Sequence, residues 1–442
     1  MPDSGSSASG RHAARMAVAV NHTRRLLGVG GLVLLGCSWR LWTPHTAFPQ
    51  IPCFHWAVHA PPAVDWAALL LLIACGLVLA IAPTAARAPT PGTGARVNWP
   101  LYGLLLGFVV QVCLDQQRGQ VWCYQLSLFA AVLISAARDA QAVRCLRWII
   151  VGVYFHSGLS KCDHAFIDTY GQQLLEAAVG QAGLTLQFQS EPVRRCLAAA
   201  LPMGELGIAC GLLHPRTRRF SLLAATAMHA LLLAALGPGG LNHRPAVLVW
   251  NAYFVIQVWT LFGQPRNKPV SEQSMIVESA EQFRNPQPRS VACRAMTVLA
   301  VLLPFLEPWG YFDQWPSWAL YSARSPRVAL LIAPGARQHI PEHLRRYLSP
   351  PRSVDGRIRL DLADWSLSQL DVPIYPQRRF QLAVMLAVAR AYRLKSAIRV
   401  EQFSAANRWT GARSMRHTDH VNELANECQT FLINTQPRRQ LE

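Results

Sequence analysis

Long apolar runs separated by short polar segments dominate the first 310 residues of this 442-residue chain. Runs of roughly this length are typical of helices that cross a membrane. The pattern therefore predicts a mainly α fold, a polytopic transmembrane helical bundle of about nine spans over residues 26–310. The first run could also be a signal peptide, but a retained helix is favoured because many spans follow it. The runs are 26–42, 65–82, 99–114, 120–137, 146–160, 196–213, 219–236, 245–262 and 292–308.

The pattern changes on both sides of this bundle. Residues 1–25 are small, polar and basic, which predicts a disordered N-terminal tail. Residues 311–414 are predicted to form a small α+β extramembrane domain, followed by a polar tail over 415–442. Within that domain the alternation of apolar and polar positions predicts strands and helices. The expected strands are 328–332, 358–362 and 398–403, and the expected helices are 339–347 and 378–395.

The charges support a membrane location. Only 15% of residues are charged, against about 25% in soluble domains. The net charge is +18, and most Lys and Arg fall in alternate short loops. This positive-inside pattern predicts a multi-pass protein of the cell membrane with a cytoplasmic N-terminus and an extracytoplasmic C-terminal domain. The expected partner is the lipid bilayer and not nucleic acid. Many of the eleven cysteines lie in the apolar runs and are expected to behave as small hydrophobes.

The end of run 146–160 carries two ionisable side chains, His156 and Lys161. Ionisable groups at membrane depth are costly and indicate function by default. Positions four apart share a helix face, so His156 lies with Ser160 and Ser157 lies with Lys161. Lys161 could simply anchor the helix end by extending its amine to the interface. Alternatively, a partly desolvated amine could act as a base.

Two further ionisable residues, Glu205 and His229, lie in the middle of consecutive runs. Counted from the basic turn between the runs, they lie at similar depth, so a Glu–His contact that shares one proton is geometrically feasible. Such sharing would satisfy both groups without leaving an isolated charge. His229 could equally be a hydrogen-bonded core residue.

The loop 237–245 is rich in glycine and proline, and glycine allows a backbone to approach a ligand closely. Asn242 and His243 lie in this loop, on the side predicted for Lys161. No metal site is predicted, because His55 and His59 are four apart only in a Pro-rich loop. The candidate substrate-binding residues are Tyr154, Ser157, Ser160, Asn242, His243 and Asn251.

The segment 154–163, Tyr-Phe-His-Ser-Gly-Leu-Ser-Lys-Cys-Asp, resembles the Y-F-x-A/S-G-x-x-K-x-x signature of the HTTM family. That family includes the membrane part of vitamin K-dependent gamma-carboxylases. Residues 205–229 resemble its next two spans, an acidic helix and a helix with a histidine joined by a basic turn. The resemblance covers about residues 20–310 and implies Lys161 as the base on a quinone-like substrate. A second likeness is to DoxX-like and MauE-like membrane proteins, which are linked to quinone or thiol redox work.

Two hypotheses follow. In the first, the protein acts on a hydrophobic quinone-like or lipid molecule, with a quinone as the candidate cofactor or substrate. Lys161 is then the base, and His156, Glu205 and His229 orient it or relay protons. In the second, the protein is a non-catalytic membrane scaffold whose outer α+β domain recruits a protein partner. Whether the chain is an enzyme is left open between them.

Overall fold

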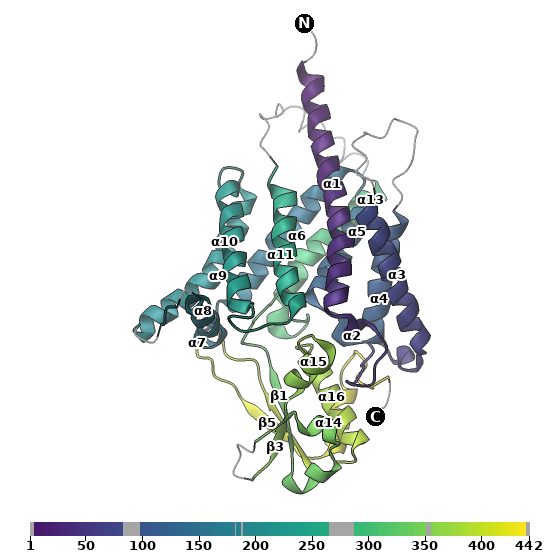
Figure 1. Cartoon of the computed structure of the whole chain (residues 1–442), viewed down its shortest axis with the longest axis vertical. Coiled ribbons are helices and arrows are strands. Elements are labelled where there is room, and N and C mark those ends of the chain that lie inside the picture. Colours follow the sequence, from purple (N-terminus) through teal and green to yellow (C-terminus); the bar gives the residue numbers. More distant parts are fainter. Residues whose placement is uncertain are drawn as a thin grey trace.

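The computed structural model describes residues 4–82, 98–181, 183–186, 189–264, 287–350 and 355–438, with side chains from residue 10 onward. Figure 1 shows a bundle of long, roughly parallel helices above a smaller domain that contains a β-sheet. The long helices are α1 (Ser4–Cys37), α3 (Pro62–Ile81), α4 (Trp99–Leu114), α5 (Val121–Ser135), α6 (Asp139–Lys161), α9 (Glu191–Leu213), α10 (Arg218–Leu236), α11 (Pro245–Phe262) and α13 (Pro288–Leu302). Shorter elements of this part are α2 (Trp39–Trp42), η1 (His55–His59), η2 (Gln116–Arg118), α7 (His164–Asp168), α8 (Tyr170–Gly180) and η3 (Leu303–Trp309).

Each of the nine apolar runs is helical, but nine spans are not confirmed. Among the described residues, five helices are long and apolar enough to cross a membrane: Pro62–Ile81, Glu191–Leu213, Arg218–Leu236, Pro245–Phe262 and Pro288–Trp309. Helices α4 and α5 are apolar but shorter. The remaining two helices mix apolar and polar residues, since α1 begins in a polar segment and α6 includes Asp139, Arg144 and Arg147.

The N-terminal segment differs from the expected disordered tail, because α1 is helical from Ser4. Met16, Ala19 and Val20 are buried, so the helix gains apolar contacts well before the run that begins at residue 26. Figure 1 shows the beginning of α1 and the sheet domain at opposite ends of the bundle. This arrangement accords with the predicted orientation, which remains a prediction.

The C-terminal domain is built on an antiparallel sheet with strand order β2-β3-β1-β4-β5. In the register of the sheet, Leu330 lies opposite both Leu360 and Val400. Alternate residues of β4 are buried, as expected of a strand with one face on a core. The strands are β1 (Arg327–Ile332), β2 (Leu348–Ser349), β3 (Ile358–Leu360), β4 (Ile398–Phe403) and β5 (Met415–Thr418).

Helix α16 (Arg378–Ala391) supplies most of this core, since its residues from Leu382 to Ala389 are buried. The predicted helix 339–347 is shared between η4 (Pro334–His339) and α14 (Glu342–Arg345). The remaining helices of the domain are α15 (Leu362–Leu370) and α17 (Val421–Gln429). The structure differs from the polar tail expected over 415–442. Strand β5 pairs with β4, and α17 is amphipathic and buries Leu424 and Cys428.

A buried cluster of charges fastens the end of the chain to the bundle. The carboxylate of Asp65, near the start of α3, lies 2.6 Å from the Arg118 guanidinium and 2.7 Å from that of Arg438. All three side chains are fully buried. Arg438 also donates hydrogen bonds to the carbonyl oxygens of Ala60 and Pro61. The C-terminal segment is therefore part of the bundle end.

Asp115, which follows α4, is fully buried beside this cluster. Its Oδ1 accepts hydrogen bonds from the backbone N–H groups of Ile51 and Gln117, at 3.3 and 3.1 Å. Burial raises the pKa of Asp115 to about 6, although the nearby Arg118 guanidinium opposes the rise. Removal of this carboxyl group from water therefore disfavours its ionised form.

We expect Asp115→Asn to flatten the pH dependence of stability. The pKa of Asp115 is higher in the folded than in the unfolded chain. The stability that this shift contributes to the folded protein is therefore complete below about pH 4 and is lost as pH rises through about 6. The free energy of unfolding of the variant should exceed that of the wild type by up to about 3 kcal/mol at about pH 8, and this difference should disappear at about pH 4. Melting temperatures measured in detergent across this range test the expectation. The exposed Asp364→Asn is the control, and equal pH profiles for all three proteins would contradict it.

Candidate functional site

Helix α6 presents polar side chains on two adjoining faces. Tyr154, Ser157 and Lys161 lie on one face, toward α9, α10 and α11. His156 and Ser160 lie on the other face, toward η3 and the C-terminal domain. The three- and four-residue spacing of the helix produces this division. It separates residues that are close in sequence into two sites.

The first site is centred on the amine of Lys161, which is only 5% exposed. The Nζ atom donates to both carboxylate oxygens of Glu205 on α9, at 2.7 and 2.9 Å, and to the Ser157 hydroxyl at 2.7 Å. Glu205 is 8% exposed. The amine is thus sheltered from solvent, and it does not extend toward the aqueous phase as an interfacial anchor would.

A second polar chain lies on the same face of α6. The Tyr154 hydroxyl lies 3.1 Å from Nε2 of His229 on α10, and His229 Nδ1 lies 3.0 Å from Oδ1 of Asn251 on α11. The chain links three helices through buried side chains. In the described part of the molecule, no hydrogen bond joins Glu205 to His229. The structure instead pairs the carboxylate with Lys161 and the imidazole with Tyr154 and Asn251.

Gly158 allows α6 and α9 to approach closely enough for the Lys161–Glu205 pair to form. A Cβ atom at this position would lie 2.9 Å from the Pro202 carbonyl oxygen and 3.2 Å from Glu205 Cβ. The lack of a side chain at Gly158 therefore sets the separation of the two helices.

We expect Gly158→Ala to push the two helices apart and to destabilise the protein by about 1–3 kcal/mol, the usual effect of overpacking. Gly152→Ala is a matched control on the same helix, because its Cβ would meet Val301 at 3.4 Å, an ordinary contact. Melting temperatures in detergent measure the difference. Equal melting temperatures for the two variants would show that Gly158 does not set the helix separation.

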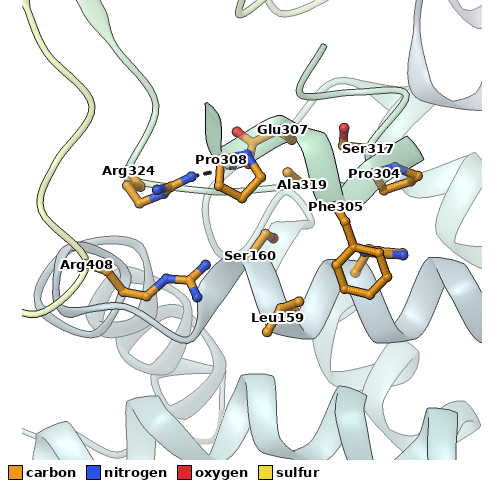
Figure 2. A pocket seen from close by; sticks show the side chains of 11 residues that line it. Leu159, Ser160, Pro304, Phe305, Glu307, Pro308, Ser317, Ala319, Arg324 and Arg408 are labelled. Atoms are coloured by element: carbon orange, nitrogen blue, oxygen red, sulfur yellow. Dashed lines mark hydrogen bonds and ion pairs between the residues drawn. The ribbon is translucent and has the colours of Figure 1, made fainter. Parts of the chain in front are cut away.

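The face of α6 that carries His156 and Ser160 borders a pocket between the bundle and the C-terminal domain, shown in Figure 2. The empty space at this pocket is about 360 Å³ when the open solvent at its mouth is counted. His156 borders it, but its Nε2 is hydrogen-bonded to the Val301 carbonyl oxygen at 2.8 Å and its ring meets that of Phe305 edge to face. The Ser160 hydroxyl donates to the Ser157 carbonyl oxygen. The structure therefore does not bring His156 together with Lys161 and Glu205.

The loop residues proposed to bind substrate lie elsewhere. Asn242 adopts a left-handed backbone conformation, with φ of 50°. The ring of His243 lies 5.8 Å from that of Tyr321, and burial lowers the pKa of His243. No hydrogen bond or ion pair recorded for the described residues links either one to Lys161. The Gly-Pro loop is thus a turn between α10 and α11 that packs against the segment leading into the C-terminal domain.

Sequence reasoning did not identify several polar residues that the structure brings together. Arg324 and Arg408 line the pocket beside Glu307, and they come from segments far apart in the chain. No local pattern marks them. Asp65 could have been identified from the sequence, because it is an acidic residue at the start of a strongly apolar run. A carboxylate in such a position needs a cationic or hydrogen-bonding partner.

These features define an integral membrane protein with several apolar helices and buried ionisable side chains in its bundle. Residues 139–244 match the family of methylamine utilisation protein MauE. The match begins at α6 and ends just before α11, so it includes Tyr154, Lys161, Glu205 and His229. It agrees with the MauE-like resemblance and gives no support to the HTTM resemblance. No curated protein and no solved structure matches the chain.

Proposed function

We propose that this membrane protein acts on a quinone-like or lipid substrate and that Lys161 and Glu205 together exchange a proton with it. The observation that carries the proposal is the ion pair itself, an ammonium and a carboxylate buried between α6 and α9. Ionisable groups inside a membrane bundle are expensive and usually functional. A buried pair is also weak support for stability, because apolar residues of similar size often replace it without loss.

In the proposed step, the Glu205 carboxylate accepts the proton of an acidic substrate hydroxyl. The substrate O–H bond breaks, an O–H bond forms on Glu205, and no electron is transferred. The Lys161 ammonium, held 2.7 Å from that carboxylate, stabilises the oxygen anion that remains. Fixed charges are effective in a site that excludes water, because the local dielectric constant is low.

The second chain of polar groups has a supporting role in this proposal. Tyr154 shares a face of α6 with Lys161, and its hydroxyl is held by His229 and, through it, Asn251. These groups can orient the polar end of the substrate or relay a proton between helices. His156 takes no part in the step, because its Nε2 is bonded to the Val301 carbonyl oxygen and its side chain lines the pocket beside η3.

Infrared difference spectra of the protein in nanodiscs test the proton transfer. Addition of a short-chain hydroquinone should produce the carbonyl band of a protonated carboxyl group. That band should be absent from Glu205→Gln and Lys161→Met but present in Lys395→Met, which alters an exposed lysine of the C-terminal domain. A band that persists in Glu205→Gln, or no band in the wild type, would refute the proposed step.

The second candidate function is that of a non-catalytic scaffold. The position of strand β5 at the edge of the sheet supports this function. This strand is the edge of the sheet, and Met415 in it is exposed, as is Trp409 in the preceding loop. An open strand edge can pair with an extended segment of another protein. If the chain is a scaffold, Lys161→Met/Glu205→Leu should complement a deletion strain fully, whereas substitutions of Met415 and Trp409 should not.

A further inference from the structure

The pocket behind α6 has a charged side and an apolar side. In Figure 2, Arg324 and Arg408 lie at one side, and Phe305 and Pro304 lie at the other. Ser160 on α6 lies between them. A cavity with this division suits a molecule that has one anionic end and one apolar end.

Backbone hydrogen bonds fix the two arginines at this site. His164, at the start of α7, donates its N–H to the Arg408 carbonyl oxygen at 2.9 Å, and Ala406 donates to the Arg324 carbonyl oxygen at 2.8 Å. The loop between β4 and β5 is thereby held against the end of the bundle. The placement of Arg408 follows from this docking of the C-terminal domain.

Among the described residues that line the pocket, Arg408 is the guanidinium without an ion pair, although the Asp163 and Glu307 carboxylates interact with its charge at longer range. Arg324 forms an ion pair with Glu307 at 3.4 Å, and both side chains are largely buried. In contrast, no acceptor among the described residues hydrogen-bonds to the half-buried Arg408 guanidinium. A guanidinium is always charged and presents its donors in a planar fork that fits a carboxylate or a phosphate.

A second polar group at the pocket also lacks a partner. Ser317 lines the pocket and is only 2% exposed, yet its hydroxyl makes no hydrogen bond to the described residues. Buried polar groups in folded proteins are nearly always hydrogen-bonded, so an unpaired one needs a reason. A bound ligand would supply the missing acceptor or donor.

Two carboxylates lie near the arginines of the pocket. The Asp163 carboxylate, which caps α7, interacts with the charges of Arg324 and Arg408. Glu307 interacts with the same two guanidiniums. Neither carboxylate forms a close ion pair with Arg408 among the described residues.

An exposed apolar stripe leads to this pocket along α13 and η3. Its residues on α13 recur at seven- and four-residue intervals, so they occupy one helix face, and two residues of η3 follow them. Phe305 belongs both to the stripe and to the pocket, and it is 41% exposed. The stripe consists of Val291, Val298, Leu302, Phe305 and Trp309.

We propose that the pocket binds the anionic head group, a carboxylate or a phosphate monoanion, of a single amphiphile whose alkyl chain lies along the α13–η3 stripe. Arg408 holds the head group, Ser317 completes its hydrogen bonds, and Phe305 contacts the first part of the chain. The site is separate from the Lys161–Glu205 pair, because neither Lys161 nor Glu205 lines the pocket. The binding proposed here does not depend on the proton transfer proposed above.

Native mass spectrometry of the protein released from phosphatidylcholine nanodiscs tests this site. Three probes are added in turn: phosphatidylglycerol, laurate, and dodecanol as the uncharged match of laurate. We expect the wild type to retain at least one anionic probe and not dodecanol. Arg408→Gln should reduce that retention about tenfold, the usual effect of losing a charge-assisted contact. Arg337→Gln, an exposed arginine of η4, should not change it.

The outcomes decide between the two sources of the head group. Retention of laurate alone assigns a fatty-acid carboxylate, and retention of phosphatidylglycerol alone assigns a phospholipid. Arg408→Lys keeps the charge and should retain part of the binding, which guards against a folding defect in Arg408→Gln. Dodecanol bound as well as laurate, or equal retention by the wild type and a folded Arg408→Gln, would overturn the proposal.

Discussion

Lys161→Met should destabilise the protein by about 3–5 kcal/mol, because it leaves the Glu205 carboxylate buried without its counter-charge. In the wild type that carboxylate receives two hydrogen bonds from Lys161, at 2.7 and 2.9 Å. Unfolding in detergent, followed by tryptophan fluorescence, measures the loss. Lys395→Met removes an exposed lysine and should have no effect. If Lys161→Met is as stable as Lys395→Met, the ion pair does not form in the protein.

The double variant Lys161→Met/Glu205→Leu separates stability from function. Removal of both charges leaves no isolated ion, so most of the lost stability should return. Proton exchange with the substrate should nevertheless remain absent. A stable double variant with normal proton exchange would show that the ion pair has no chemical role.

Asp65→Asn is expected to have the other large effect, also about 3–5 kcal/mol, because it removes the carboxylate that pairs with two buried guanidiniums. Those guanidiniums belong to Arg118 and Arg438, which both contact the carboxylate in the wild type. Arg438 reaches the bundle from the end of the chain, so the variant should also release the C-terminal segment. Proteolysis of that segment and the melting temperature measure the two effects.

Two comparison variants test the explanation based on charge. Arg438→Met leaves Asp65 paired with Arg118, so it should cost less than Asp65→Asn. Asp364→Asn alters an exposed acid at the beginning of α15 and should change neither measurement. If Arg438→Met destabilises the protein more than Asp65→Asn does, the hydrogen bonds from Arg438 to the carbonyl oxygens of Ala60 and Pro61 contribute more to stability than the ion pair.

Helix spacing alone predicted part of the site. Residues four apart share a face, and the structure places Ser157 beside Lys161 as expected. Counting along the runs also placed Glu205 and His229 deep in the bundle. The count gives the depth of a side chain but not the direction in which its helix is rotated. For that reason the sequence suggested a Glu205–His229 contact, whereas each residue has a different partner in the structure.

Other features depend on contacts between distant parts of the chain. The pairing of Arg438 with Asp65 and the meeting of Arg324 with Arg408 both require the C-terminal domain to dock on the bundle. No local pattern in the sequence predicts this contact between the domain and the bundle. Nine spans are not confirmed for a different reason, since apolar runs were counted without the charged residues that extend the helices, as in α6.

A mass spectrum of the organic extract of the purified protein tests most directly whether the Lys161–Glu205 pair serves a hydrophobic substrate. We predict that a quinone-like or lipid molecule with an ionisable hydroxyl group co-purifies with the wild type and with Lys395→Met. It should be depleted in a folded Lys161→Met/Glu205→Leu variant. The same molecule in equal amount in all three extracts, or no such molecule in any of them, would contradict the account.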